Sequence, residues 1–312
     1  MDKTMGERQR WLWLLSALTV VVAVRGCGLG WLWVLAGCIP AVGYYIYMDK
    51  KTDSDGIGKL LTVKWGVGGK VLAVICLAWT VLAMGWTADL ADGAFPMVNG
   101  FPVLGWIMLA LAGWGSFKGP AACARCAGIL CVFLLALYGA VVAFAIPDVQ
   151  INHLIPRGNW LSGVEALGLC LLPACIWFLP GAKGKAETSW AWALPLVAVV
   201  LPAVTAGVLS PALAEALPVP LYTLGQSVSL FGVLERIEPL LSVAMTMGVF
   251  CLLSAMACAC RVLADNLRPC PWSGIVACVV AGGLMGVVRG VPATLLTASA
   301  VVFWVVLPLV TL

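Results

Sequence analysis

Residues 232–250, GVLERIEPLLSVAMTMGVF, hold three charged side chains at the start of an otherwise apolar run that continues to Ala259. An α-helix of about 20 apolar residues crosses the roughly 30 Å hydrocarbon layer of a bilayer, so this stretch predicts a membrane-spanning helix. A charged side chain in such a helix is costly, about 2.5–3.5 kcal/mol at its centre. Glu235, Arg236 and Glu238 should therefore face a bundle interior or a wet cavity, or mark the headgroup edge, where arginine can extend outward.

The whole chain shares this apolar character. Of its 312 residues, 62% are hydrophobic and only 10% are charged, and the mean hydropathy is +1.05. Apolar runs of 17 or more residues recur along the sequence, which excludes a soluble domain. We predict an all-α polytopic membrane protein, with residues 1–312 forming a single transmembrane domain.

Ten membrane spans are expected, and the first is short. A basic start and a mostly apolar run of fourteen residues resemble a signal peptide with a lipoprotein site at Gly26-Cys27. Arg25 just before this pair and the apolar run that follows at once favour a retained span. The expected spans are residues 11–24, 31–48, 67–86, 101–117, 121–146, 161–179, 190–209, 229–259, 272–288 and 293–312.

The basic residues predict the orientation of these spans. With the N-terminus inside, Arg25, Arg157 and Arg289 fall outside and Arg236 lies near the outer end of a span. The excess of lysine and arginine on cytoplasmic loops supports this arrangement, in which both termini are cytoplasmic. The residues on the inner side are then Lys3, Arg8, Arg10, Lys50, Lys51, Lys59, Lys64, Lys70, Lys118, Arg125, Lys183, Lys185, Arg261 and Arg268.

Several chemistries have no support in the sequence. His153 is the only histidine, so neither a Ser-His pair nor a histidine metal cluster can be built, and no Gly-Lys-Ser/Thr loop is present to hold phosphate. Cys123 and Cys126 have the Cys-x-x-Cys spacing, but the other cysteines are scattered through apolar spans, which favours packing over redox chemistry. We expect no enzyme activity, no cofactor, no metal and no nucleic-acid partner.

Glycine and proline suggest how the spans are organised. Pro173 and Pro180 interrupt the sixth span, Gly163 and Gly168 are expected to loosen it, and glycines end the first. Transporters with inverted repeats often break one helix in each half, which here would give a five-plus-five repeat with halves at about 11–146 and 161–312. The other interpretation is that glycine and proline are simply common in membrane helices.

The charged residues of two spans are expected to meet. Glu165 is the only acidic residue inside any other span, and it enters from the same side as Arg236. Glu235 and Glu238 share a helix face, whereas Arg236 points away from Glu238 and needs a distant partner. We therefore predict that Glu165 and Arg236 pair across the outer half of a pocket.

Two stretches resemble the B subunits of spore-germination receptors. The first, residues 118–160, resembles the fifth span and following loop of that family. The second resembles its Glu-Arg-Leu-Glu pattern before a span with Gly-x-Phe. The matching residues are Gly119, Ala124, Arg125, Pro147, Asp148, Asn152 and Pro156 in the first stretch, and Glu235, Arg236, Ile237, Glu238, Gly248 and Phe250 in the second.

This resemblance implies the ten-span fold of the amino acid, polyamine and organocation transporter superfamily. It also implies a subunit that holds a small germinant, commonly an amino acid, in a central pocket, and that acts with an A subunit and a lipoprotein C subunit in the spore inner membrane or cell membrane. Two features depart from the family pattern: the first span is short, and Met245 stands where an aromatic residue is expected. Glu165, Glu235, Arg236, Glu238 and Met245 are the pocket or gating residues that we predict, and Arg125, Pro147, Asp148 and Gly248 the family motif.

Two other functions stay open. An ion-coupled amino acid permease would need a titratable group in its path, for which Glu165 is the best candidate. A structural membrane subunit with an empty pocket is the third possibility.

Overall fold

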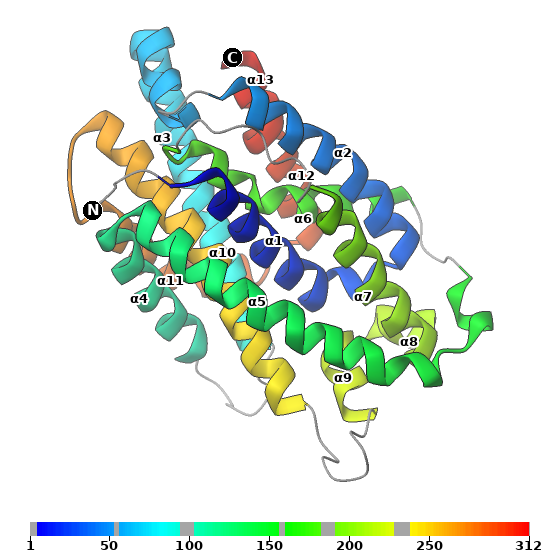
Figure 1. Ribbon diagram of the computed structural model, residues 1–312. Helices are drawn as coiled ribbons and strands as arrows, with labels where there is room; N and C mark the ends of the chain where they lie inside the picture. Colours follow the sequence, from blue (N-terminus) through cyan, green and yellow to red (C-terminus); the bar gives the residue numbers. More distant parts are fainter. Residues whose placement is uncertain are drawn as a thin grey trace.

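The described residues are almost entirely helical. The structure is a computed structural model that describes residues 5–52, 56–93, 103–155, 160–181, 191–227 and 238–311. Within these ranges an isolated bridge between Met5 and Gly181 is the only β-pairing, so the predicted all-α fold is confirmed. The first half of the chain (Figure 1) forms α1 (Glu7–Val24), η1 (Gly26–Gly28), α2 (Trp31–Lys51), α3 (Gly56–Gly93), α4 (Val103–Lys118), α5 (Pro120–Ala145), η2 (Ile146–Asp148) and η3 (Ile151–Leu154).

The second half adds a broken helix, two short helices and four longer helical segments. Its last segment contains a π-helical turn, η6, between two α-helices. The elements are α6 (Trp160–Leu171), η4 (Leu172–Phe178), α7 (Ala193–Leu209), α8 (Pro211–Ala216), α9 (Pro220–Ser227), α10 (Glu238–Leu267), α11 (Ser273–Val288), α12 (Ala293–Val301), η6 (Val302–Val306) and α13 (Leu307–Thr311).

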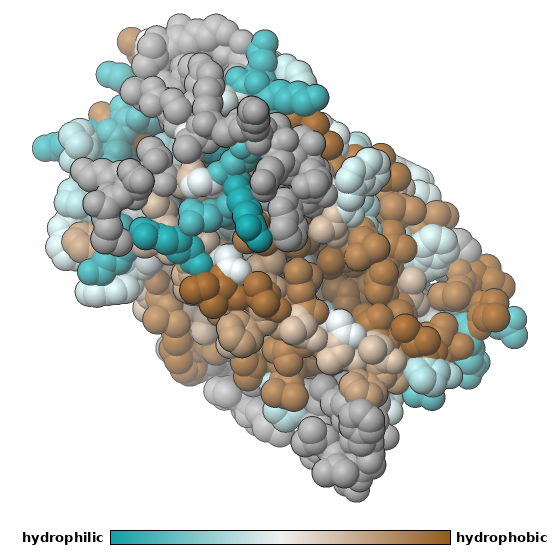
Figure 2. Space-filling view, in the orientation of Figure 1, coloured by the Kyte–Doolittle hydropathy of each residue, from teal (hydrophilic) through white to brown (hydrophobic). Residues whose placement is uncertain are grey.

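The helices have the length and surface of a membrane protein. Large apolar side chains such as Ile129, Phe133 and Leu196 are more than half exposed. Figure 2 shows hydrophobic side chains across the middle of the visible face and hydrophilic ones toward its two ends. The count of ten spans and the five-plus-five repeat stay predictions. Among the described residues, the segments long and apolar enough to cross a membrane are Trp31–Lys51, Gly66–Leu90, Pro120–Asp148, Trp160–Phe178 and Glu238–Leu267, and shorter apolar helices are Val103–Lys118, Ala193–Leu209, Ser273–Val288 and Ala293–Leu309.

Helix α1 lies inside the bundle, where it contacts α5, α7 and α10 (Figure 1). Every residue from Trp13 to Val24 is buried, as expected for a helix that is apolar all round. The Trp13 indole donates a hydrogen bond to the Cys251 carbonyl of α10 at 2.7 Å. The helix begins at Glu7, before the predicted start at residue 11, and its 18 residues span about 27 Å. The helix is therefore longer than the apolar run alone predicted.

The predicted interruption of the sixth span is present. Helix α6 ends at Leu171, and the chain continues to Phe178 as the 3-10 helix η4. Pro173 has no amide hydrogen to donate to a carbonyl of the preceding turn, which explains the change. The first span differs, because α1 runs unbroken to Val24 before η1 follows.

Glycines 163 and 168 tighten the packing of α6, so the expectation that they loosen it is wrong. A Cβ on Gly168 would lie 2.0 Å from the Thr297 carbonyl oxygen of α12. A Cβ on Gly163 would lie 2.8 Å from the Trp33 ring, and one on Gly37 of α2 would lie 2.5 Å from the α6 backbone. Helix α6 is therefore held between α2 and α12 at positions where only hydrogen fits.

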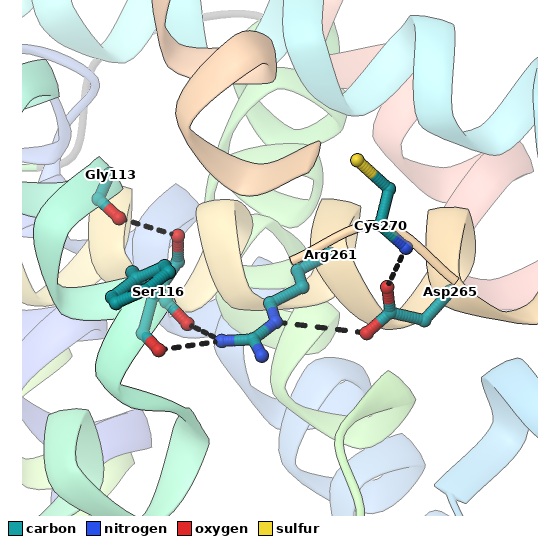
Figure 3. Close-up of polar contacts among 6 residues, drawn as sticks. Gly113, Ser116, Arg261, Asp265 and Cys270 are labelled. Carbon is teal, nitrogen blue, oxygen red and sulfur yellow. Dashed lines mark hydrogen bonds and ion pairs between the residues drawn. The ribbon is translucent and has the colours of Figure 1, made fainter. Parts of the chain in front are cut away.

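The sequence predicted that this span ends at Ala259, but α10 continues for two more turns, to Leu267. The reason is Arg261, whose guanidinium donates to the backbone carbonyls of Ser116 and Phe117 at the end of α4 (Figure 3). Its Nε also lies 3.7 Å from the Asp265 carboxylate one turn along the helix. The carbonyls at the end of α4 and the Asp265 carboxylate satisfy the charge of Arg261, so the helix can include this arginine. The predicted start, residues 229–237, lies outside the described residues.

Helix α3 extends beyond its predicted span at both ends and is kinked at Gly66. This residue has φ 52° and ψ −120°, a conformation that glycine adopts readily because it lacks a Cβ. The apolar segment begins at the kink, close to the predicted start at residue 67.

Candidate functional site: a cavity beside Arg25 and Glu165

A cavity of about 340 Å³ lies at the end of the bundle that the basic residues predict to be outside, called the outer end here. Its walls come from the turn after α1, the start of α6, and the α7–α9 region. Ligand pockets for small molecules are commonly about 300–1,000 Å³, so the cavity has the size for a small solute. The charged side chains that line it are Arg25, Glu165 and Glu215, and most of the rest are apolar, including Leu29, Leu161, Leu217, Pro211, Pro218 and Pro220.

An ion pair joins two walls of this cavity. Arg25 Nε donates to Glu165 Oε1 at 3.1 Å. The Glu165 side chain is only 7% exposed, whereas the Arg25 side chain is 40% exposed. The carboxylate thus depends on the guanidinium for its stability, because a buried charge without a partner is strongly disfavoured. Among the described residues the Nη groups of Arg25 make no hydrogen bond, so they can bind a second anionic group.

Local backbone structure places Arg25 at the cavity. Its amide donates to the Val21 carbonyl and closes the last turn of α1, and the 3-10 turn η1 follows immediately. Gly30 then adopts φ 87° and leads into α2. This left-handed conformation favours glycine, so the chain reverses within a few residues. The backbone of Arg25 is thereby fixed at the end of α1, beside the cavity.

Helix ends add partial charges to the cavity. Leu161 and Ser162 lie in the first turn of α6 and line the cavity. The first amides of a helix have no partner within it and carry partial positive charge, which favours an anion nearby. Arg25 and the start of α6 therefore form a positive side of the cavity, while the acidic groups are Glu165 and Glu215.

The structure places the predicted pocket residues in different environments. Glu165 lines the cavity, but Met245 is fully buried within the packing of α10 and does not. Glu238 is the first residue of α10 and lies beside Gly225 of α9, outside the cavity lining. Glu235 and Arg236 lie outside the described residues, so the predicted Glu165–Arg236 pair stays untested. In the described structure the partner of Glu165 is Arg25.

The family-motif residues lie away from the cavity lining. Arg125 is exposed on α5 and donates to the Ala121 carbonyl of its own helix at 3.1 Å. Pro147 and Asp148 are exposed in η2 at the outer end. Gly248 faces α1, where an added Cβ would lie 2.5 Å from the Cβ of Val20. Gly248 therefore has a packing role between α1 and α10.

A second buried ion pair lies at the opposite end of α1. Arg10 Nη1 is 3.9 Å from Asp49 Oδ1, and the guanidinium carbon lies 4.9 Å from the centre of the Trp177 ring. This cluster joins α1, α2 and η4 where the chain also makes the Met5–Gly181 bridge. These contacts join α1, α2 and η4 at the end of the bundle opposite the cavity.

Sequence reasoning missed Arg25 as a site residue. Arg25 was interpreted as a residue that flanks the first span. A charge directly after a mostly apolar run of fourteen residues also needs a partner, for the same reason as Glu165.

In the described part of the chain, no group of three or more His, Cys, Asp or Glu side chains is placed to hold a metal ion. No protein-family model matches the sequence, and no curated protein matches it significantly.

Proposed function

We propose that this protein is a permease-like membrane subunit that binds a small zwitterion, such as an amino acid, in the outer cavity. The observation that supports it is the Arg25–Glu165 pair in a cavity of suitable size that also contains Glu215. The Nη groups of Arg25 and the positive end of the α6 dipole match a carboxylate. The acidic side chains match an ammonium group, and the leucines and prolines match an aliphatic side chain.

Within this proposal the protein is the B-type subunit of a spore germination receptor that senses a germinant together with A-type and lipoprotein C-type subunits. The resemblance of residues 118–160 and 235–250 to that family supports this assignment. Sensing by a receptor subunit needs a binding site and partners, but no path through the membrane.

The buried polar groups favour sensing over transport. Among the described residues, the charged side chains of Arg10, Asp49 and Glu165 are at most 7% exposed, and they lie in ion pairs at the two ends of α1. Buried hydroxyls between them, such as Thr19 and Thr205, donate to carbonyls of their own helices. A proton-coupled permease, the alternative, would use Glu165, which is already engaged by Arg25.

Binding of amino acids to the purified protein in lipid nanodiscs tests the proposal. We expect saturable binding of L-leucine and other aliphatic amino acids, measured by scintillation proximity with labelled ligand. Arg25→Lys keeps the charge beside Glu165 but removes the planar fork that holds a carboxylate, so it should weaken binding about tenfold. Arg289→Lys is the matched control, because Arg289 pairs with Asp89 at the same end but outside the cavity lining.

Equal affinities of the wild type and Arg25→Lys, or no saturable binding of any amino acid, would contradict a zwitterion site at Arg25. Vesicles that contain the purified protein should show only background uptake of the amino acid that binds. Strong, gradient-dependent uptake would instead identify the permease. Deletion of the gene should abolish the response of spores to one class of germinant.

The orientation of the cavity can be tested by labelling one introduced and one native cysteine. Of the thirteen, only Cys126 and Cys270 are exposed. We expect a membrane-impermeant maleimide to label Asn152→Cys in a Cys126→Ser, Cys270→Ser background on intact cells, because Asn152 is exposed in η3 at the outer end. Cys270 of the wild type, in the turn before α11, should react only after permeabilisation. The reverse labelling pattern would place the cavity on the cytoplasmic side.

A further inference from the structure

Helix α8 holds one acidic residue, Glu215, against the cavity. Ser210, the residue before α8, has φ 76° and is the only described residue other than glycine with positive φ. Such a conformation is strained for a residue with a Cβ and persists where the surroundings enforce it. Pro211 begins the helix directly after Ser210, and the Ser210 hydroxyl accepts a hydrogen bond from the Leu213 amide. The direction of α8 is therefore set by its first residues.

Contact with the turn after α1 fixes where α8 lies. Ala214 is buried, and its carbonyl oxygen would be 3.2 Å from a Cβ on Gly28 of η1. The next residue, Glu215, lines the same cavity as Arg25 and Glu165. The close approach of Ala214 to a glycine thus brings a third charged side chain to the cavity.

The two acidic residues of the cavity differ in how they are engaged. Glu165 is buried and accepts the hydrogen bond from Arg25. Glu215 is exposed, and among the described residues it makes neither an ion pair nor a hydrogen bond. Among the described residues that line the cavity, one acidic group is balanced by the one basic side chain, and a second acidic group is available to a cation.

We propose that Glu215 is the specificity-determining residue that binds the ammonium group of the ligand. This inference rests on the proposed function, in which Arg25 and the start of α6 bind the carboxylate. A protonated amine gains a charged hydrogen bond with Glu215. A deaminated analogue leaves Glu215 without a partner and brings its own negatively charged carboxylate into the cavity. The site then selects amines over otherwise identical carboxylic acids.

Three probes with one aliphatic skeleton test this selection. They are L-leucine, its deaminated analogue 4-methylpentanoate, and its decarboxylated analogue 3-methylbutylamine, each measured for binding to the full-length protein in nanodiscs. We expect the wild type to prefer leucine to 4-methylpentanoate, and Glu215→Gln to reduce that preference at least tenfold. Glu215→Gln should also weaken 3-methylbutylamine, while its affinity for 4-methylpentanoate should stay equal or increase.

The control is Asp148→Asn, which removes an exposed carboxylate at the same end but outside the cavity lining. It should leave all three affinities unchanged. Leucine preference that survives in Glu215→Gln would overturn the role of Glu215 while leaving the proposed function intact. No saturable binding of leucine to the wild type would contradict the proposed function itself, and with it this inference.

Discussion

Replacing Gly168 with alanine should lower the free energy of unfolding by about 3 kcal/mol, near the upper end for overpacking. The added Cβ would lie 2.0 Å from the carbonyl oxygen of Thr297 and 2.3 Å from its carbonyl carbon. These are backbone atoms, so no side-chain rotation can relieve the overlap, and α6 must move away from α12. We expect a clearly lower melting temperature for the purified variant in detergent, followed by intrinsic fluorescence.

Gly283→Ala is the matched control for this substitution. Gly283 also lies within a helix, α11, but no heavy atom lies within 4 Å of the position that its Cβ would occupy. The control should therefore keep the melting temperature of the wild type. Equal melting temperatures for both variants would show that α6 and α12 are not packed at Gly168, and the placement of Glu165 on α6 would lose its support.

Composition and hydropathy predicted the fold class because they depend on sums over many residues. Among the described residues, the five helical segments long and apolar enough to cross a membrane follow from runs of apolar residues that are visible in the sequence. The interruption of the sixth span was also predictable, since Pro173 acts within its own turn. Local chemistry was sufficient in both cases.

Contacts between distant parts of the chain could not be predicted in this way. Arg261 is tolerated within α10 because carbonyls of α4, about 145 positions earlier, accept its hydrogen bonds. Gly168 was interpreted as a loosening residue, but its role is set by Thr297 of another helix. Met245 was placed in the pocket through the family resemblance, whereas it is buried in the packing of α10.

The candidate site was predicted in part. Glu165 was identified because an acidic residue inside an apolar span needs a partner, and it does line the cavity. The partner itself was missed, since Arg25 is 140 positions away and stands at a span end, where basic residues usually report topology. Glu215 lies within a proline-containing stretch, residues 211–220, that carries no motif.

Neutralising either member of the Arg25–Glu165 pair should destabilise the protein, and Arg25→Gln should do so more than Glu165→Gln. The first variant leaves a carboxylate that is only 7% exposed without its cation, which should cost about 3 kcal/mol. The second leaves a guanidinium that is 40% exposed and can be hydrated, so about 1 kcal/mol is expected. In the double variant the two amides can share a hydrogen bond, and most of the loss should be recovered.

Denaturant unfolding of the wild type, both single variants and the double variant gives the coupling energy of the pair. We expect a coupling of at least about 1 kcal/mol, within the range for residues in direct contact. The Arg289–Asp89 pair serves as control, because its arginine is 63% exposed and exposed pairs contribute about 0–1 kcal/mol. If the effects of Arg25→Gln and Glu165→Gln simply add, the two residues do not stabilise each other. Glu165 would then need another cation, and Arg236, in the segment outside the described residues, is the one that the sequence predicts.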